Sequence, residues 1–279
     1  VRALPTIREG SPLPRVADIH YDYRLALVAI PYVDKLRINP GTMRKGLPEI
    51  ASKVKEYGIP IRVGANTGSL QHHSSGSEGL ISDAIEQVRL LESHGVSDIV
   101  VSLKASNVTT MIAAYTGFAR EYPQYPLHLG VTEAGVGDDG IVRSAVGIGT
   151  LLAQGIGDTI RVSLSGNPVD EIPVAKKILS ALDLRKGPRV ISCPTCARST
   201  IDVSGIARRV EDVCARHAGK DTDIRIAVMG CMVNGIGEAG DSDIALVGHE
   251  RGPLLFIGGK EGTRRRLVAD SAADEFIKE

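Results

Sequence analysis

Short apolar runs with polar residues at alternating positions recur along the first two thirds of the chain. We expect them to be β-strands, at residues 14–20, 33–41, 59–68, 97–106, 126–135 and 158–166. The stretches between them, such as "SEGLISDAIEQVRLLESHG" and "DEIPVAKKILSAL", have the apolar spacing of amphipathic helices. A strand–helix–strand rhythm of this kind predicts a parallel sheet, either doubly wound or closed into a barrel.

Polar residues near the carboxyl end of each run fall on one parity, so they share one face of their strand. They are Asp18 and His20; Lys35, Arg37 and Asn39; Arg62 and Asn66; Ser102 and Lys104; and Arg161 and Ser163. Polar groups that converge from many strand ends are typical of a (β/α)₈ barrel. A doubly wound sheet would gather its site behind a G-x-G-x-x-G loop, and that motif follows none of these runs. We therefore predict an α/β fold with a TIM-type barrel.

The pattern changes after about residue 186. "PRVISC", "DIRIAVMGC", "SDIALVGHE" and "PLLFIGGK" have the character of strands, and "DVSGIARRVEDVCARHAG" and "LVADSAADEFIKE" that of helices. We predict a barrel domain over residues 1–186 and a small α+β domain over residues 187–279. Six strands cannot close an eight-stranded barrel, and the chain begins inside a helix-like stretch, so we expect a barrel that lacks its first two strands.

The composition narrows the classes of partner. The chain has 279 residues with 33 Lys and Arg and 33 Asp and Glu, a formal net charge of zero. This balance argues against nucleic acid or an anionic membrane as a partner of the whole chain. The apolar runs are strand-sized and broken by charges, so we predict neither a signal peptide nor a membrane span and expect a cytoplasmic protein. In a reducing compartment, Cys-x-x-Cys motifs bind metal or do redox work more often than they form disulfides.

Three of the four cysteines lie in the motifs "CPTC" and "GCMVNGIGEA". Each motif follows a predicted strand, so Cys193, Cys196 and Cys231 can meet at one end of the small sheet, and we interpret "NGIGEA" as a turn that brings Glu238 back to them. A structural zinc site would explain Cys-x-x-Cys, but Cys231 lacks a partner at zinc-ribbon spacing. A 4Fe–4S cluster with three thiolates and a weaker oxygen ligand suits the pattern better. The residues alone leave both metals open.

The predicted barrel mouth has the residue types of an anion-binding site. Arginine binds a diphosphate through bidentate hydrogen bonds. The candidate substrate-binding residues are Arg37, Asn39, Arg62, Asn66, Lys104, Arg161 and Ser163. Glu133, at the end of "GVTE", is a candidate general acid if burial raises its pKa; the alternative is a solvated loop carboxylate.

Together the motifs closely resemble a known family. "VADIHYDYRLAL", "LRINPG", "VSLKAS", "PLHLGVTEAG", "GIGDTIRVSL", "CPTCAR" and "GCMVNGIGEA" follow one another as in 4-hydroxy-3-methylbut-2-enyl diphosphate synthase of the methylerythritol phosphate pathway to isoprenoids. The resemblance implies a TIM barrel followed by a domain similar to the cluster-binding unit of nitrite and sulfite reductases. It also implies a 4Fe–4S cluster held by Cys193, Cys196, Cys231 and Glu238.

The implied reaction is the reductive opening of 2-C-methyl-D-erythritol 2,4-cyclodiphosphate, with Glu133 as proton donor and Glu238 as a second catalytic residue. Flavodoxin or ferredoxin is the implied one-electron donor. A homodimer is also implied, in which the cluster domain of one subunit caps the barrel of its partner. The family usually reads N-G-P-G-E where this chain has Ile236, and because proline fixes φ we expect a less rigid loop around Glu238.

Two other functions compete with this one. The first is a non-redox barrel enzyme that acts on a phosphorylated small molecule and has a structural zinc site. The second is a zinc-ribbon module that binds nucleic acid, which the neutral charge disfavours.

Overall fold

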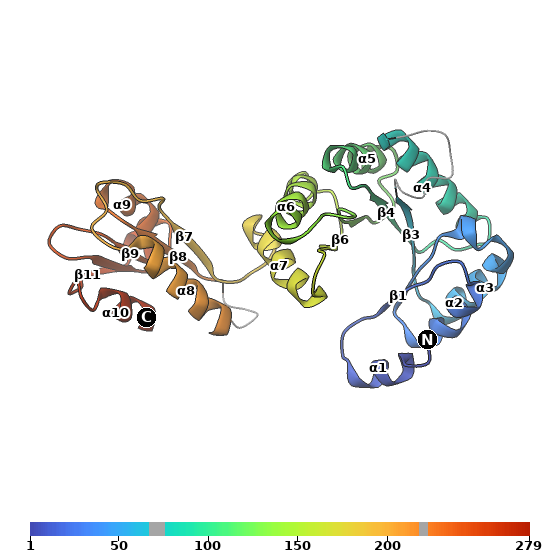
Figure 1. Ribbon diagram of the computed structural model, residues 1–279, viewed down its shortest axis with the longest axis horizontal. Coiled ribbons are helices and arrows are strands. Elements are labelled where there is room, and N and C mark those ends of the chain that lie inside the picture. The colour runs from blue at the N-terminus through green and yellow to red at the C-terminus, as the bar shows by residue number, and fades with distance from the viewer. Residues whose placement is uncertain (67–75, 218–222) are drawn as a thin grey trace. The chain divides into compact units, whose positions relative to one another are not determined.

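The computed structural model describes residues 1–66, 76–217 and 223–279. The chain divides into two compact units, which we call the barrel unit (Val1–Leu182) and the C-terminal unit (Asp183–Glu279) (Figure 1). Within the described residues, no helix combines the length and the apolar character that crossing a membrane requires.

The strands of the barrel unit are parallel, and each pairs with the next strand in the sequence. One sheet has the order β1-β2-β3-β4, β5 pairs with β6, and a bridge between Val101 and Leu127 links β4 to the start of β5. Sequential pairing is the topology of a (β/α) barrel, which confirms the predicted fold class. The strands within the described ranges do not close the ring. They are β1 (Val16–Asp18), β2 (Lys35–Arg37), β3 (Ile61–Asn66), β4 (Ile99–Lys104), β5 (His128–Leu129) and β6 (Thr159–Ile160).

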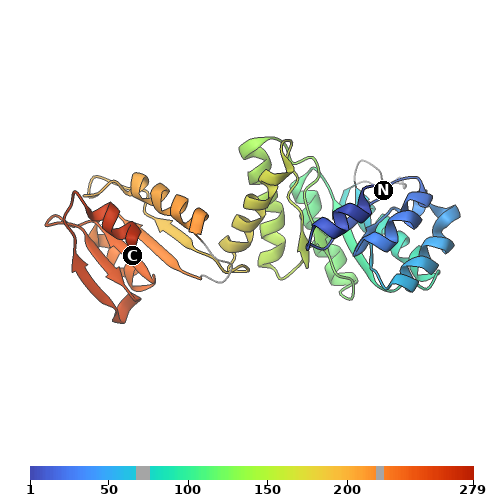
Figure 2. The same ribbon diagram turned by 90° about the horizontal axis from the view of Figure 1, so that it is seen from below.

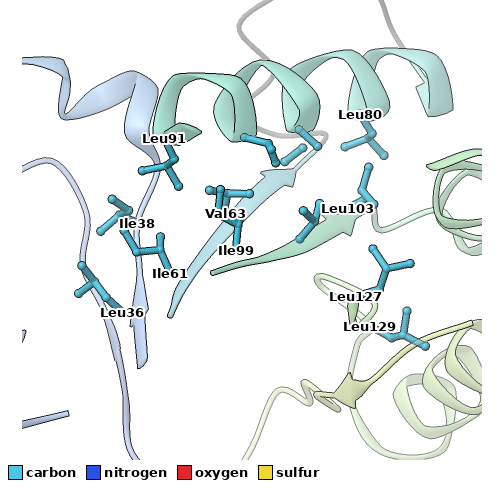
Figure 3. Packing of buried hydrophobic residues seen from close by; sticks show 14 of the residues in the cluster. Leu36, Ile38, Ile61, Val63, Leu80, Leu91, Ile99, Leu103, Leu127 and Leu129 are labelled. Atoms are coloured by element: carbon cyan, nitrogen blue, oxygen red, sulfur yellow. The ribbon is translucent and has the colours of Figure 1, made fainter. Parts of the chain in front are cut away.

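Helices cover one face of these strands because every second strand residue is aliphatic. Leu36 on β2 and Val63 on β3 are fully buried among these aliphatic residues. Figure 3 shows Leu80 and Leu91 of α4 directed toward this aliphatic face. The residues of opposite parity therefore lie on the other face of the strands, away from the helices. The helices are α1 (Leu4–Gly10), α2 (Tyr23–Ala29), α3 (Leu47–Tyr57), α4 (Gly76–Glu92), α5 (Val108–Glu121), α6 (Gly137–Ala153) and α7 (Glu171–Ala181).

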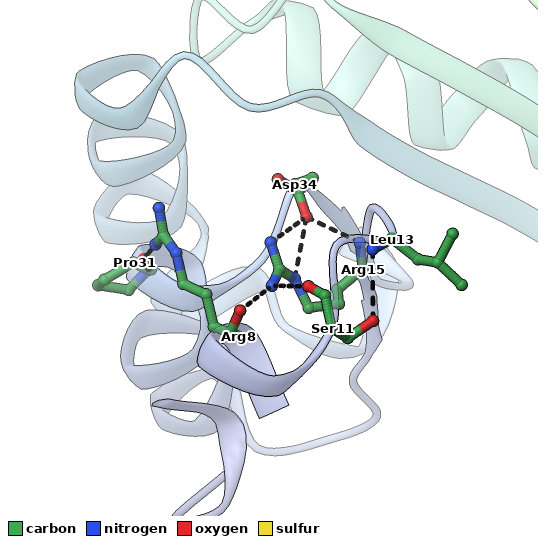
Figure 4. Close-up of polar contacts among 6 residues, drawn as sticks. All are labelled: Arg8, Ser11, Leu13, Arg15, Pro31 and Asp34. Atoms are coloured by element: carbon green, nitrogen blue, oxygen red, sulfur yellow. Dashed lines mark hydrogen bonds and ion pairs between the residues drawn. The ribbon is translucent and has the colours of Figure 1, made fainter. Parts of the chain in front are cut away.

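An aspartate in front of β2 fixes the start of β1 (Figure 4). Asp34 Oδ2 accepts the backbone N–H of Arg15 at 2.7 Å and its guanidinium Nη2 at 3.0 Å. Arg15 Nη1 also donates to the carbonyl of Arg8 at 3.1 Å, which ties the end of α1 to the strand. Burial is not needed for this contact, because a carboxylate that accepts a backbone N–H forms a charge-assisted hydrogen bond.

A hydrogen bond from a backbone N–H to an aspartate just before the neighbouring strand recurs at two other places. Asp158 Oδ2 accepts the N–H of Leu127 at 2.7 Å, just before β5 and β6 pair. In the C-terminal unit, Asp243 Oδ2 accepts the N–H of Arg225 at 2.7 Å. In each case the aspartate holds the first residue of the neighbouring parallel strand or the residue just before it, so it helps to set the register of the pair.

The C-terminal unit has one mixed sheet in the order β11-β10-β9-β8-β7, with helices on both faces (Figure 2). Helices α8 and α10 pack on one face and α9 packs on the other. Strands β7, β8 and β9 are parallel, and β10 and β11 are antiparallel to their neighbours. The elements are β7 (Arg189–Ser192), α8 (Val203–His217), β8 (Arg225–Met229), α9 (Met232–Gly240), β9 (Ile244–Val247), β10 (Leu254–Ile257), β11 (Thr263–Arg266) and α10 (Ala272–Lys278).

The segment that carries Glu238 is a helix, so the predicted turn is wrong, and so is the less rigid loop that we expected around Ile236. Gly235 is buried against β9, and a Cβ at this position would lie only 2.3 Å from Val247 Cγ1. The glycine therefore allows close packing of helix on sheet rather than a turn. Ile236 supplies a backbone N–H and is exposed, whereas a proline at this fifth helical position would remove a helical hydrogen bond.

Candidate functional site

The cationic residues predicted at the barrel mouth lie on the helix-free face of the strands. Arg37 on β2 is in register with Arg62 on β3, and Asn66 is in register with Lys104 across β3 and β4. Arg161 follows β6 and extends its pairing, because its N–H donates to the carbonyl of Leu129 at 2.8 Å. The structure thus brings Arg37, Arg62, Lys104 and Arg161 together from four strands.

Burial and the neighbouring positive charges lower the pKa values of two of these residues, Lys104 and Arg62. Burial lowers the pKa of Lys104 to about 8, and Arg161, Arg62 and Arg37 lower it too, while Asp18 opposes them. Burial also lowers the pKa of Arg62, although this guanidinium stays protonated because its ordinary value is so high. Partly dehydrated positive charges that repel one another favour the binding of an anion.

Asp18 and His20 hold Arg37 in place. Asp18 Oδ1 accepts a hydrogen bond from Arg37 Nη1 at 3.0 Å, and the same nitrogen contacts His20 Nε2. The side chain of Arg37 is only 18% exposed, so this contact fixes a guanidinium with limited access to water.

Gly130, the residue after β5, allows the backbone at Arg161 to approach closely beside Lys104. A Cβ at Gly130 would lie 2.8 Å from the carbonyl oxygen of Arg161 and 3.4 Å from Lys104 Nζ. The carbonyl of Arg161 therefore approaches the backbone more closely than any side chain at this position would allow, and Lys104 packs beside the glycine. Sequence reasoning missed Gly130, although glycine inside a strand often marks such a close approach.

The predicted polar partners of the cations have differing local contacts. Asn39 caps a 3₁₀ turn, Pro40–Thr42, because its Oδ1 accepts a hydrogen bond from the N–H of Gly41 at 3.0 Å. Its Nδ2 group can donate to a ligand. Asn66 Nδ2 lies 3.5 Å from Thr132 Oγ1. Ser163 is half-buried and lies two residues after Arg161, on the same face of the chain.

A neutral polar layer lies under the cations, and sequence reasoning missed it. His128 is 6% exposed, and its Nδ1 lies 2.9 Å from Thr159 Oγ1. Burial, together with the cations Arg62 and Lys104, holds the pKa of His128 far below its usual range, so the imidazole is neutral. Tyr115, fully buried, donates to the carbonyl of His128 at 2.6 Å and ties this layer to α5.

Glu133 lies in a constrained loop after β5. Its φ is 54°, a left-handed conformation that non-glycine residues seldom adopt. Arg143 Nη1 donates to the carbonyl of Ala134 at 3.2 Å, and the N–H of Ser165 donates to the carbonyl of Gly135 at 3.0 Å. Glu133 is exposed, so the described part of the chain does not supply the burial on which the general-acid role was conditional. Its role as an acid stays a prediction.

Three cysteines line one pocket of the C-terminal unit. Cys193 follows β7, and Cys231 precedes α9 at the end of the adjacent parallel strand β8, so both lie at the same edge of the sheet. Together with Cys196 they line a pocket of about 230 Å³. Thr195, with a φ of 60°, turns the chain between the first two cysteines, and the N–H of Gly230 donates to Cys193 Sγ at 3.2 Å.

The donor set suits an iron–sulfur cluster. Thiolates that accept backbone N–H groups are typical cluster ligands, and the pocket is much larger than a single ion needs. Within the described ranges, no three Cys, His, Asp or Glu side chains lie close enough together to hold one metal ion as they stand. Sulfurs around a zinc ion would lie about 4 Å apart, whereas a cluster binds each thiolate through a different iron and accepts ligands spread around a pocket.

The structure does not bring Glu238 into this pocket. The residues that line the pocket include the three cysteines but not Glu238. Glu238 lies on α9, seven residues after Cys231, which is about 10 Å along the helix axis. Its predicted part in binding the cluster therefore stays a prediction.

Comparison with solved structures adds little to the fold. The crystal structure of HPPK-DHPS in complex with substrates matches with a TM-score of 0.42 and 14% identity, and the match covers 64% of this chain and 33% of that chain. A similarity of this size supports no further inference.

Family models and curated relatives match almost the whole chain. The models of the GcpE TIM-barrel domain and the GcpE protein C-terminal domain match residues 1–176 and 189–279. 4-Hydroxy-3-methylbut-2-en-1-yl diphosphate synthase (flavodoxin) of Natranaerobius thermophilus is 45% identical over 293 residues, which cover 100% of this chain and 81% of the relative. The protein of the same name from Thermotoga maritima is 47% identical over 281 residues, with coverages of 100% and 78%. The chain therefore belongs to the GcpE family.

Proposed function

We propose that this protein is a 4Fe–4S oxidoreductase that converts 2-C-methyl-D-erythritol 2,4-cyclodiphosphate to 4-hydroxy-3-methylbut-2-enyl diphosphate in the methylerythritol phosphate pathway. The conversion takes up two electrons and two protons, opens the ring at a C–O bond and releases one water. The observation that carries the proposal is the pocket lined by Cys193, Cys196 and Cys231 in a member of the GcpE family.

The cationic face of the barrel unit would hold the diphosphate. Arg37, Arg62 and Arg161 are suited to bidentate hydrogen bonds with phosphate oxygens, and Lys104 adds a fourth positive charge below pH 8. A hydrogen bond to a charged group contributes about 1.5–3 kcal/mol. The side chains of Asn39, Asn66 and Ser163 would supply neutral donors to the remaining oxygens.

The three cysteines would hold the cluster, which when bound supplies one-electron reduction of the substrate. Glu238 is the proposed fourth ligand. It lies almost two helical turns after Cys231, the N-cap residue of α9, and helical side chains tilt toward the helix N-terminus. Backbone N–H donors such as that of Gly230 stabilise the negative charge on the sulfurs.

Glu133 is the proposed proton donor to the hydroxyl that leaves as water. Its left-handed φ and the contacts of Arg143 and Ser165 with the following residues would hold its carboxyl group at the end of β5. We further propose a cytoplasmic homodimer in which the C-terminal unit of one subunit serves the barrel of its partner. Flavodoxin, which the relatives carry in their names, is the proposed electron donor, with ferredoxin as the alternative.

Anaerobic purification followed by iron, sulfide and absorbance measurements tests the proposal. We expect a brown protein with about four irons per chain that turns over the cyclodiphosphate with dithionite or reduced flavodoxin. Cys196→Ser should lose iron, whereas Cys214→Ser should keep it, because Cys214 lies on α8 and does not line the cysteine pocket. A colourless, zinc-containing wild-type protein without turnover would refute the proposal and favour the non-redox barrel enzyme.

A further inference from the structure

Two cavities of the C-terminal unit share one wall, the segment 193–195. One of them is the cysteine pocket. The other is a cavity of about 440 Å³, which we call the α8 cavity; Ser204, Arg208 and Glu211 of α8 line it together with the segment. Cys193 lines both cavities, so the α8 cavity offers a second route to this residue.

The α8 cavity is built on a fixed floor with a polar rim. Val203 and Ala207, which also line it, are buried and belong to the apolar core beneath α8. Ser204, Arg208 and Glu211 are exposed. A small surface of mixed polarity is typical of weak, transient complexes such as those that transfer electrons, because a large apolar patch would slow dissociation.

The proposed function requires two reactants at one cluster, and the following inference rests on it. Each turnover takes up two electrons, and a carrier that gives one electron at a time must dock twice for each substrate. A carrier that docked on the substrate side would compete with the cyclodiphosphate. A separate approach to Cys193 removes this conflict, and the α8 cavity provides one within the described residues.

We propose that the α8 cavity and the first two turns of α8 form the docking surface for the one-electron carrier protein. Two reduced carriers dock there in succession, and each is oxidised by one electron. The two electrons enter past Cys193, and with two protons they convert one cyclodiphosphate to the product and one water. Substrate and carrier therefore reach the cluster through different cavities.

The test compares two reductants in full-length, cluster-loaded enzyme. Ser204→Trp fills the cavity and Arg208→Glu reverses the charge on its rim. Arg264→Trp and Arg264→Glu are matched controls, because Arg264 is exposed on β11, at the opposite edge of the sheet from β7. With reduced flavodoxin we expect kcat/KM to fall about tenfold in both α8 variants and to stay within about twofold in the controls. With dithionite, which needs no docking surface, all four variants should match the wild type.

Several results would overturn the inference. Equal flavodoxin-dependent rates in α8 variants and controls would show that the carrier docks elsewhere. A parallel loss with dithionite would show that the substitutions disturb the cluster. A change of sedimentation coefficient in Ser204→Trp would make the surface a contact between copies of the chain. Failure of the wild-type enzyme with dithionite would instead refute the proposed function, which keeps the two failures distinct.

Discussion

The pH dependence of anion binding is a direct test of the cationic barrel face. Lys104 lies among Arg37, Arg62 and Arg161, and its pKa of about 8 means that it is mostly charged at pH 7 and mostly neutral at pH 9. A bound diphosphate favours the charged amine and raises this pKa, so binding takes up a proton. The affinity should therefore be full below pH 8 and fall as the pH rises above it.

The size of the effect follows from the contact that is lost. A hydrogen bond to a charged group contributes about 1.5–3 kcal/mol, so deprotonation of Lys104 should weaken binding about 10- to 150-fold. Lys104→Arg keeps its charge at every working pH, so the fall should disappear. The absolute affinity can change for another reason, because the side chain of Lys104 packs against Gly130. The slope against pH is therefore the informative quantity.

Calorimetric titration with inorganic pyrophosphate between pH 7 and 10 measures this slope. The anion itself titrates, but equally for both proteins, so the ratio of wild-type to variant affinity isolates Lys104. Repeating the titration in buffers of different ionisation enthalpy counts the protons taken up. Parallel curves for the two proteins, with no proton uptake near pH 8 by the wild type, would refute the assignment of the depressed pKa to Lys104.

Three further predictions concern the backbone. Glu133→Asn should abolish turnover yet increase the free energy of unfolding by up to about 1 kcal/mol, and so raise Tm, because asparagine tolerates the left-handed φ. A lower Tm would show that the backbone at Glu133 is not strained. Gly235→Ala should cost about 1–3 kcal/mol in urea unfolding and reduce bound iron, because its Cβ would lie 2.3 Å from Val247 Cγ1, whereas Gly237→Ala in the same helix, with open space around it, should be neutral or stabilising. Asp158→Ala should destabilise by about 1–3 kcal/mol, because it leaves the N–H of Leu127 without its carboxylate; an Asp158→Asn protein that unfolds as easily as the alanine variant would show that the acceptor is not what matters.

The sequence predicted the barrel strands and their faces well because one face is aliphatic. On β2 and the two residues after it, Leu36 and Ile38 are fully buried, whereas Lys35, Arg37 and Asn39 lie on the other parity. This alternation identified the face on which the cations lie. The strands are shorter than the predicted runs because the polar residues at their carboxyl ends continue into loops.

Features that depend on tertiary packing were not predictable from the sequence. The glycines around Glu238 suggested a turn, but the contact of Gly235 with β9 that favours a helix is visible only once the sheet exists. Strand β11 is exposed along its whole length, so it carries no apolar alternation to reveal it. The neutral layer around His128 was hidden because a single histidine between leucines has the same pattern whether it binds a ligand or fills a core.

Gly130 places part of the anion site under the control of a residue that has no functional group. A catalogue of this face compiled from polar side chains alone would leave it out, although the close approach of the Arg161 backbone, beside Lys104, depends on the missing Cβ. A relative that kept every cation but acquired a side chain at this position would present the same charges in a different pattern. For anyone who redesigns the barrel toward another phosphorylated substrate, position 130 offers a way to shift the backbone that carries Arg161, and so to move a charge without adding or removing one.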